Sequence, residues 1–90
     1  MKVQNMVSPN GNKTANQFEV RDDQGNIYFQ SYDTIIAKVD NQGKTTLDAK
    51  MWDYSTTTGK YRNQFLGESK AETLKKIKSG EYKLADLNKK

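Results

Sequence analysis

The stretch 52–66 gathers aromatic, hydroxyl and basic side chains, and its residue types suit ligand binding better than any other segment of the chain. Within it, Lys60, Tyr61, Arg62 and Asn63 place two cations, an aromatic ring and an amide side by side. Sites for single-stranded nucleic acid combine cations that follow the phosphates with aromatic faces on which bases stack, at ~1–3 kcal/mol per base. Tyrosine, tryptophan and arginine also dominate the binding energy of protein interfaces. The segment is therefore typical of a surface that binds nucleic acid or protein.

The side chains that most often perform catalysis are missing, because the chain has no histidine and no cysteine. Nucleophilic catalysis would then need a serine activated by lysine, and neither Ser31 nor Ser55 has a lysine at a suitable spacing. The acids, including Glu19, Asp33 and Asp48, show no ordered metal-binding pattern, and the glycines form no phosphate-binding loop. We expect a non-enzymatic protein with no catalytic residue, no metal and no cofactor.

The net charge of +4 belongs to the second half of the chain. Residues 1–49 carry five basic and six acidic side chains, a net −1, whereas residues 50–90 carry ten and five, a net +5. Coulomb attraction would draw the second half towards phosphates or towards an acidic protein surface. The alternative is that these lysines only form the solvated face of a helix.

Alternation of apolar and polar residues predicts a sheet in the first half of the chain. Over 16–22 the pattern places Phe18 and Val20 on one face of a strand, and over 27–32 it separates Phe29 from the tyrosines. Further strands are expected at 2–7, 35–39, 45–47 and 82–86, with an exposed loop at 8–15 and Asp/Asn/Gly turns at 22–26 and 40–44. With helices in the second half, this predicts an α+β fold built on a small antiparallel sheet of about five short strands.

A first helix is indicated over 55–66, because Tyr54, Thr58, Tyr61 and Phe65 recur at intervals of four, three and four. Three threonines and a central glycine lower the helix propensity of this segment, so a hairpin is the alternative. We favour the helix. The C-terminal half is therefore expected to contain two α-helices, or one if this segment is a hairpin.

A second helix follows, because Ser69 and Glu72 have the spacing of a capping box. Behind this start, Ala71, Leu74 and Ile77 form an apolar stripe, and a Ser-Gly pair ends the helix.

The length of 90 residues predicts one small domain, with residues 88–90 as a frayed tail. Four large apolar side chains are expected in its core: Trp52, Phe29, Phe18 and Phe65. Without cysteines the core has no disulfide, and no apolar segment approaches the ~20 residues that span a bilayer. Since no signal peptide is evident, we expect a cytoplasmic protein that does not bind membranes.

A resemblance to a known family is carried by three runs of residues. These are Asn16-Gln17-Phe18, then Tyr28-Phe29-Gln30-Ser31-Tyr32-Asp33-Thr34-Ile35-Ile36-Ala37, then Trp52-Asp53-Tyr54-Ser55 with Thr57, Lys60, Tyr61, Asn63, Phe65 and Leu66. Over about residues 15–67 the chain resembles a small, uncharacterised domain of bacteriophages and other mobile elements, and a YFQSYD-like motif at 28–33 is its most specific part. The resemblance assigns no activity to any residue. It implies a phage protein in the cytoplasm of an infected bacterium, a context in which small proteins bind nucleic acid or disable host proteins.

These observations lead to a phage-type accessory binding protein that contacts nucleic acid through its basic, tyrosine-rich second half. The expected contact residues are Tyr28, Tyr32, Tyr54, Lys60, Tyr61, Arg62, Lys75, Lys76 and Lys78. The alternative is an inhibitor of a host defence protein, such as a CRISPR or other nuclease system, that acts by direct contact. In that case Trp52, Tyr54 and Tyr61 become the anchors of a protein interface.

Overall fold

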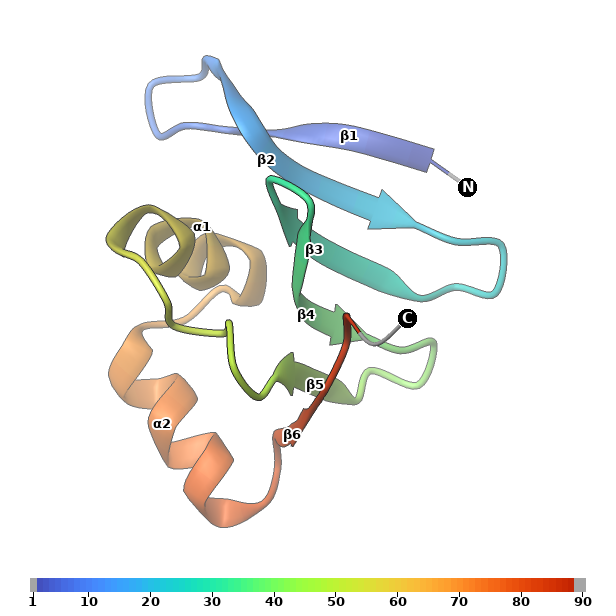
Figure 1. Cartoon of the computed structure of the whole chain (residues 1–90), viewed down its shortest axis with the longest axis vertical. Coiled ribbons are helices and arrows are strands. Elements are labelled where there is room, and N and C mark those ends of the chain that lie inside the picture. Colours follow the sequence, from blue (N-terminus) through green and yellow to red (C-terminus); the bar gives the residue numbers. More distant parts are fainter. Residues whose placement is uncertain (1, 89–90) are drawn as a thin grey trace.

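The computed structural model describes residues 2–88 and shows one sheet with two helices packed on one of its faces (Figure 1). The strands are β1 (Lys2–Val7), β2 (Lys13–Arg21), β3 (Ile27–Ser31), β4 (Thr34–Val39), β5 (Thr45–Asp48) and β6 (Lys83–Ala85). The helices are α1 (Thr56–Leu66) and α2 (Lys70–Ser79). The predicted α+β class is confirmed, and both helices lie in the C-terminal half.

The strand order in the sheet is the same as the order in the chain, from β1 to β6. The first five strands pair antiparallel as a meander, whereas β6 pairs parallel to β5 because both helices carry the chain back before it. The sheet therefore has six strands rather than about five. Since β2 begins at Lys13, the loop expected at 8–15 is shorter and ends at residue 12.

The turns at 22–26 and 40–44 use the same hydrogen bonds. In each turn, an aspartate Oδ1 accepts from the backbone N–H groups two and four residues ahead, at 2.9 and 3.0 Å for Asp22 and at 2.9 and 2.9 Å for Asp40. Each turn also contains a glycine with a positive φ, +86° at Gly25 and +82° at Gly43. The predicted turn chemistry is confirmed at both places, and these carboxylates hold the chain reversals.

The core lies between the sheet and the two helices. Phe29, Ile36 and Leu47 are fully buried, and the Phe29 ring stacks on Phe65 of α1 with 5.9 Å between the centroids. Trp52 and Phe65 are partly buried and pack against this cluster. Three of the four predicted core aromatics are therefore in or against the core.

Phe18 lies on the other face of the sheet, so its expected place in the core is wrong. Glu19 pairs with Phe29 across β2 and β3, which puts Glu19 on the helix side. Because successive side chains alternate between faces, the neighbouring Phe18 points away from the helices, beside Gln30. The alternation within the strand was predicted, but not which of its two faces the helices cover.

Helix α1 is confirmed over the segment where a hairpin was the alternative. Ser55 caps its start by accepting a hydrogen bond from the Thr58 amide at 3.1 Å, and Gly67 ends it at φ +70°. The Thr58 hydroxyl lies 3.1 Å from that of Ser31, which fixes α1 against β3. A buried pair of hydroxyls thus offsets the low helix propensity of the threonine run.

Helix α2 begins with the predicted capping box, because the side chains of Ser69 and Glu72 each accept a hydrogen bond from the backbone N–H of the other residue. The apolar stripe, however, is only partly correct. Thr73 is the fully buried residue of this helix, Leu74 is 38% exposed, and Ile77 packs against the core. The helix is therefore turned by about one position relative to the prediction.

A buried carboxylate joins the end of β5 to the C-terminal segment. Asp48 is 2% exposed, and its Oδ2 accepts from the backbone N–H groups of Lys50 at 3.2 Å and Met51 at 2.9 Å. Its Oδ1 accepts from the Leu87 amide at 2.9 Å and from the Asn88 side chain at 3.1 Å. One side chain thus satisfies four donors from two distant segments.

Asn88 belongs to the folded domain rather than to a frayed tail. Its side chain accepts from the Ile35 amide at 2.7 Å and donates to the Ile35 carbonyl at 2.9 Å. Asn88 thereby satisfies both backbone polar groups of Ile35 and joins the C-terminal segment to β4. Residues 89–90 of the predicted tail lie outside the described residues.

Candidate functional site

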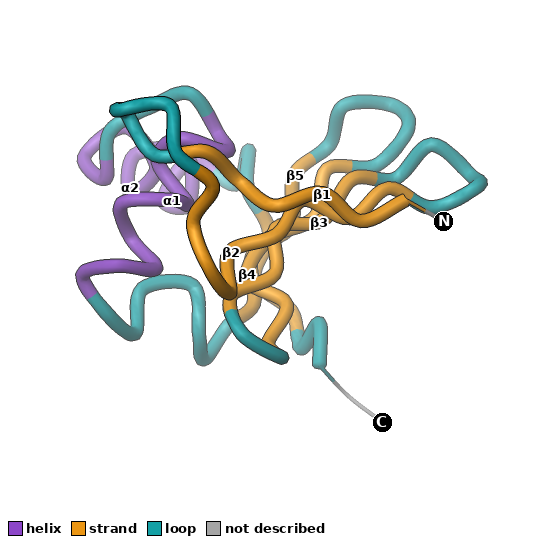
Figure 2. Tube along the Cα trace, turned by 90° about the horizontal axis from the view of Figure 1, so that it is seen from above, coloured by secondary structure: helices purple, strands orange, loops and turns teal. Residues whose placement is uncertain are grey.

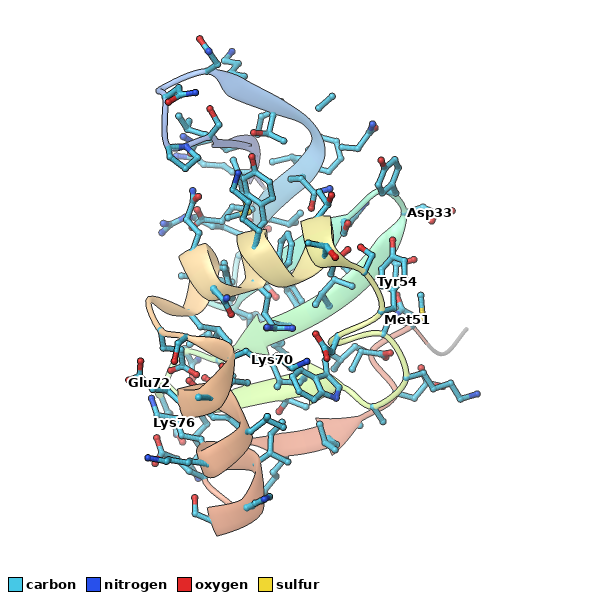
Figure 3. The ribbon with its side chains drawn as sticks, turned by 90° about the vertical axis from the view of Figure 1, so that its left-hand side faces the viewer. Asp33, Met51, Tyr54, Lys70, Glu72 and Lys76 are labelled. Atoms are coloured by element: carbon cyan, nitrogen blue, oxygen red, sulfur yellow. The ribbon has the colours of Figure 1, made fainter. Side chains whose placement is uncertain are left out.

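The nine residues predicted to bind a partner do not form one surface. Tyr54 and Lys60 line a groove along α1, and the other predicted lysines lie on α2; both helices face the viewer in Figure 3. Tyr28 lies on the opposite face of the sheet. Its ring is 5.8 Å from Lys38 Nζ and its hydroxyl donates to Asp22 at 3.3 Å. Burial and the nearby Asp22 raise the pKa of Tyr28.

Tyr32 occupies the tip of the β3–β4 hairpin, outside the groove. The side chain is 56% exposed, and the backbone adopts a left-handed conformation with φ +57°. A two-residue loop between antiparallel strands favours a positive φ at its first residue, a conformation that a bulky side chain seldom adopts.

Tyr61 and Arg62 are buried, so neither offers the exposed face that the sequence predicted. Tyr61 is 5% exposed, and its hydroxyl lies 2.7 Å from that of Thr14, which ties α1 to β2. Arg62 is 1% exposed. Among the three consecutive residues 60–62, only Lys60 is exposed to a partner.

Arg62 organises the floor of the groove. Its Nη1 donates to the Trp52 carbonyl at 2.8 Å and to Asp53 Oδ1 at 3.0 Å, while Nη2 donates to Asn63 Oδ1 at 3.0 Å. The guanidinium carbon lies 5.1 Å from the centroid of the Trp52 ring, within the range of a cation–π contact. The buried Nε has no hydrogen-bond partner within residues 2–88.

The groove runs along one side of α1 and has a volume of about 550 Å³. One wall is formed by α1 residues that recur every three or four positions and so share one face of the helix. The other wall is formed by the segment before α1 and by the first residue of α2. The lining residues are Asp53, Tyr54, Ser55, Thr56, Gly59, Lys60, Arg62, Asn63 and Lys70.

Gly59 keeps the middle of this groove open. A Cβ there would lie 3.6 Å from both Nη atoms of Arg62 and 3.7 Å from Asp53 Oδ1, which are ordinary van der Waals distances. Nothing in the packing of the described residues excludes alanine, and alanine would favour the helix by about 1 kcal/mol. The fold itself does not need glycine at this position, and a methyl group would fill space above Arg62.

The groove carries a net charge of +2, from Lys60, Arg62 and Lys70 against Asp53. Lys70 Nζ lies 2.7 Å from Asp53 Oδ2, and this hydrogen bond, with that of Arg62, lowers the pKa of Asp53. Asp53 is thus ionised and neutralised by its neighbours. Lys60 forms no ion pair within residues 2–88, and Tyr54 is 46% exposed at the rim. Lys60 Nζ instead lies 5.7 Å from the centroid of the Tyr61 ring, and Lys60 lines the same groove as the exposed Tyr54 ring.

Lys70 is the lining residue that lies outside the segment 52–66, and it was not among the predicted contact residues. The signal was present, because the Ser69 capping box starts α2 two residues after Gly67 ends α1. So short a connection returns the first residue of α2 to the neighbourhood of α1, on the side where Asp53 lies.

The α2 lysines divide into two kinds. Lys75 and Lys78 are exposed, as predicted. Lys76 instead lies 2.7 Å from Glu68, whose carboxylate also accepts from Thr73 at 2.6 Å and Tyr82 at 2.7 Å. The Glu68 side chain is 4% exposed. Lys76 therefore holds α2 to the rest of the fold and is not free for a phosphate.

This cluster predicts an acid-sensitive stability. Burial opposes ionisation of Glu68, but the hydrogen bonds from Lys76, Thr73 and Tyr82 outweigh it and lower its pKa. A lowered pKa stabilises the fold above the unfolded value of about 4.3, and this stabilisation is lost as pH falls through the folded value. Glu68→Gln should cost about 1–2 kcal/mol at pH 7 and much less near pH 3, measured by urea unfolding.

The matched control is Glu81→Gln, because Glu81 is 63% exposed and 4.0 Å from the same Lys76. It should leave the unfolding free energy nearly unchanged at both pH values. A Glu68→Gln variant whose stability ran parallel to that of the unmodified protein at all pH values would contradict the role assigned to Glu68.

The described residues contain no group of three or more His, Cys, Asp or Glu side chains placed to hold a metal ion. No helix within residues 2–88 is long and apolar enough to cross a membrane. The groove offers a partner hydrogen-bond donors, cations and the exposed ring of Tyr54.

Comparisons with known proteins give a family but no activity. No curated protein and no solved structure matches the chain. A family model matches residues 1–81, which is most of the chain and includes all of β1–β5, α1 and α2. The chain therefore belongs to the family of unknown function DUF8033.

Proposed function

We propose that this protein is a non-enzymatic accessory binding protein, of the phage type, that contacts single-stranded nucleic acid through the α1 groove. The observation that carries the proposal is that the exposed Tyr54 ring and the ammonium of Lys60 line one groove of net charge +2. A base stacks on an exposed aromatic ring while lysines meet the adjoining phosphates. Both requirements are met within one groove.

The lysines of α2 extend this surface. Lys70 and Lys78 are two steps of four residues apart, so they lie on one side of the helix, about 12 Å from each other along its axis. Lys75 is exposed nearby on the same helix. A strand that stacks on Tyr54 therefore meets further cations as it leaves the groove.

The test is fluorescence anisotropy of labelled single-stranded DNA and RNA at ~50 and ~200 mM salt. Lys60→Gln should weaken binding about threefold to tenfold and reduce the slope of log affinity against log salt by about 0.7. The matched control is Lys44→Gln, which removes the same charge from the exposed β4–β5 turn. The control should change affinity much less than Lys60→Gln.

The outcomes separate a site from general attraction. Equal losses in both variants would mean that only net charge matters, and the groove would not be the site. No binding at low salt by the unmodified protein would reject nucleic acid as the partner. The inhibitor of a host protein would then be the function to test, with Tyr54 as an interface residue.

A further inference from the structure

The side chains around the α1 groove offer mainly hydrogen-bond donors. The oxygens of Asp53 are occupied by Lys70 and Arg62, and Asn63 Oδ1 is occupied by Arg62. The remaining polar groups at the lining include the ammonium of Lys60, the amide NH₂ of Asn63 and the hydroxyl of Thr56. A site that presents donors and positive charge is matched to an acceptor-rich anion.

The floor adds a donor that the fold leaves unused. Arg62 is 1% exposed, and its Nε is buried without a hydrogen-bond partner within residues 2–88. Such orphaned donors are rare, because a buried polar group without a partner destabilises the fold. The guanidinium lies against the open side of Gly59, where a Cβ would be 3.6 Å away. The Nη1 and Nη2 groups of Arg62 and the missing side chain of Gly59 thus occur at the same place in the groove.

We infer that the space over Gly59, above the Arg62 guanidinium, is a binding position, or seat, for one phosphate group. The groups that would hold the phosphate are the Lys60 ammonium, the Asn63 amide and the Thr56 hydroxyl. Gly59 is the residue that admits it, since glycines mark positions where a ligand approaches the backbone closely. Asp53 does not exclude an anion, because Lys70 at 2.7 Å and Arg62 at 3.0 Å neutralise its charge. This inference rests on the proposed function and assigns one phosphate of the bound strand to a defined position.

The phosphate could be an internal phosphodiester or a terminal monoester, and the probes distinguish the two. Amide chemical shifts of the ¹⁵N-labelled full chain would be followed during titration with inorganic phosphate at constant ionic strength. The same shifts would be followed with thymidine dinucleotides that carry or lack a 5′-phosphate. Saturable shifts centred on Gly59 and Lys60 support the seat. A preference for the 5′-phosphorylated dinucleotide assigns it to a terminal group, and equal shifts assign it to the phosphodiester.

The discriminating variant is Gly59→Ala, which fills the seat without removing a charge. Its thermal midpoint should be unchanged or higher, because alanine favours the helix and meets no close contact. Its affinity for the phosphate probes should fall about fivefold or more, as expected for loss of a charge-assisted hydrogen bond. Lys60→Gln gives a second, independent loss at the same amides.

Failure of the seat and failure of the proposed function give different results. If Gly59→Ala bound the phosphate probes as well as the unmodified protein, the seat would be overturned, whether or not single-stranded DNA still bound. If inorganic phosphate shifted Gly59 saturably while no oligonucleotide bound at low salt, the seat would stand and nucleic acid would be rejected. Shifts spread evenly over all exposed lysines would also overturn the seat.

Discussion

Arg62→Ala should lower the free energy of unfolding by about 3 kcal/mol, a large share of the 5–15 kcal/mol that stabilises a typical domain. The guanidinium satisfies the Trp52 carbonyl, Asp53 and Asn63 at once, at 2.8, 3.0 and 3.0 Å. Truncation removes the donor of the Trp52 carbonyl, of Asp53 Oδ1 and of Asn63 Oδ1, and it removes the group on which the Trp52 ring packs. Urea unfolding followed by far-UV circular dichroism measures the loss independently of tryptophan fluorescence.

Two further variants at the same position identify the cause. Arg62→Lys keeps the charge but cannot reproduce the forked donor geometry, so it should lose nearly as much stability as the alanine variant. Arg62→Met keeps most of the volume, and Lys70 still pairs with Asp53, so it should lose less. A loss below about 1 kcal/mol for Arg62→Ala would show that the buried network contributes little. Because Arg62 has this structural role, binding in the groove is tested by mutating Lys60 or Gly59 and not Arg62.

Asp48→Ala should be as damaging, lowering the free energy of unfolding by about 3 kcal/mol or more. The carboxylate accepts from three backbone amides and one side-chain amide at 2.9 to 3.2 Å. Without it, buried donors of the turn after β5 and of the C-terminal segment lose their partner. Hydrogen exchange of the Leu87 amide, together with urea unfolding, measures both the local and the global effect.

The comparison with Asn88→Ala tests how this loss divides between the two segments. Asn88 donates to Asp48 and pairs with both backbone groups of Ile35, so its removal should cost about 1–2 kcal/mol. Asp48→Asn keeps one acceptor oxygen, so its loss in the free energy of unfolding should fall between those of Asp48→Ala and Asn88→Ala. Equal losses for Asp48→Ala and Asn88→Ala would mean that the amides of Lys50 and Met51 do not depend on the carboxylate.

The elements that the sequence predicted correctly are those that local rules decide. The aspartates at 22 and 40, with the glycines at 25 and 43, reverse the chain through hydrogen bonds that span at most four residues. The capping box of α2 likewise involves only Ser69 and Glu72. Such interactions form in the same way wherever the segment lies in the fold, so residue type and spacing predict them.

The candidate site was harder to predict, because exposure depends on contacts between distant segments. Tyr61 and Lys60 are adjacent, yet Tyr61 is buried through contacts such as that with Thr14, forty-seven positions away. Lys76 and Lys75 are likewise adjacent, and only the position of Glu68 and Tyr82 decides which of them is free. Composition identified the segment for which we propose binding, but not the side of each helix that faces solvent.

The late position of β6 in the chain has a consequence for folding. The antiparallel pairs from β1 to β5 form between neighbouring segments, whereas both helices, purple in Figure 2, lie between β5 and β6 in the chain, so β6 is the last strand available to pair. Until then β5 is an open edge whose unpaired backbone groups could pair with another unfinished chain. Asp48 lies at the end of that edge, and we expect its side chain to oppose such pairing. We therefore expect the residue that anchors the finished domain to act against aggregation while the domain is incomplete.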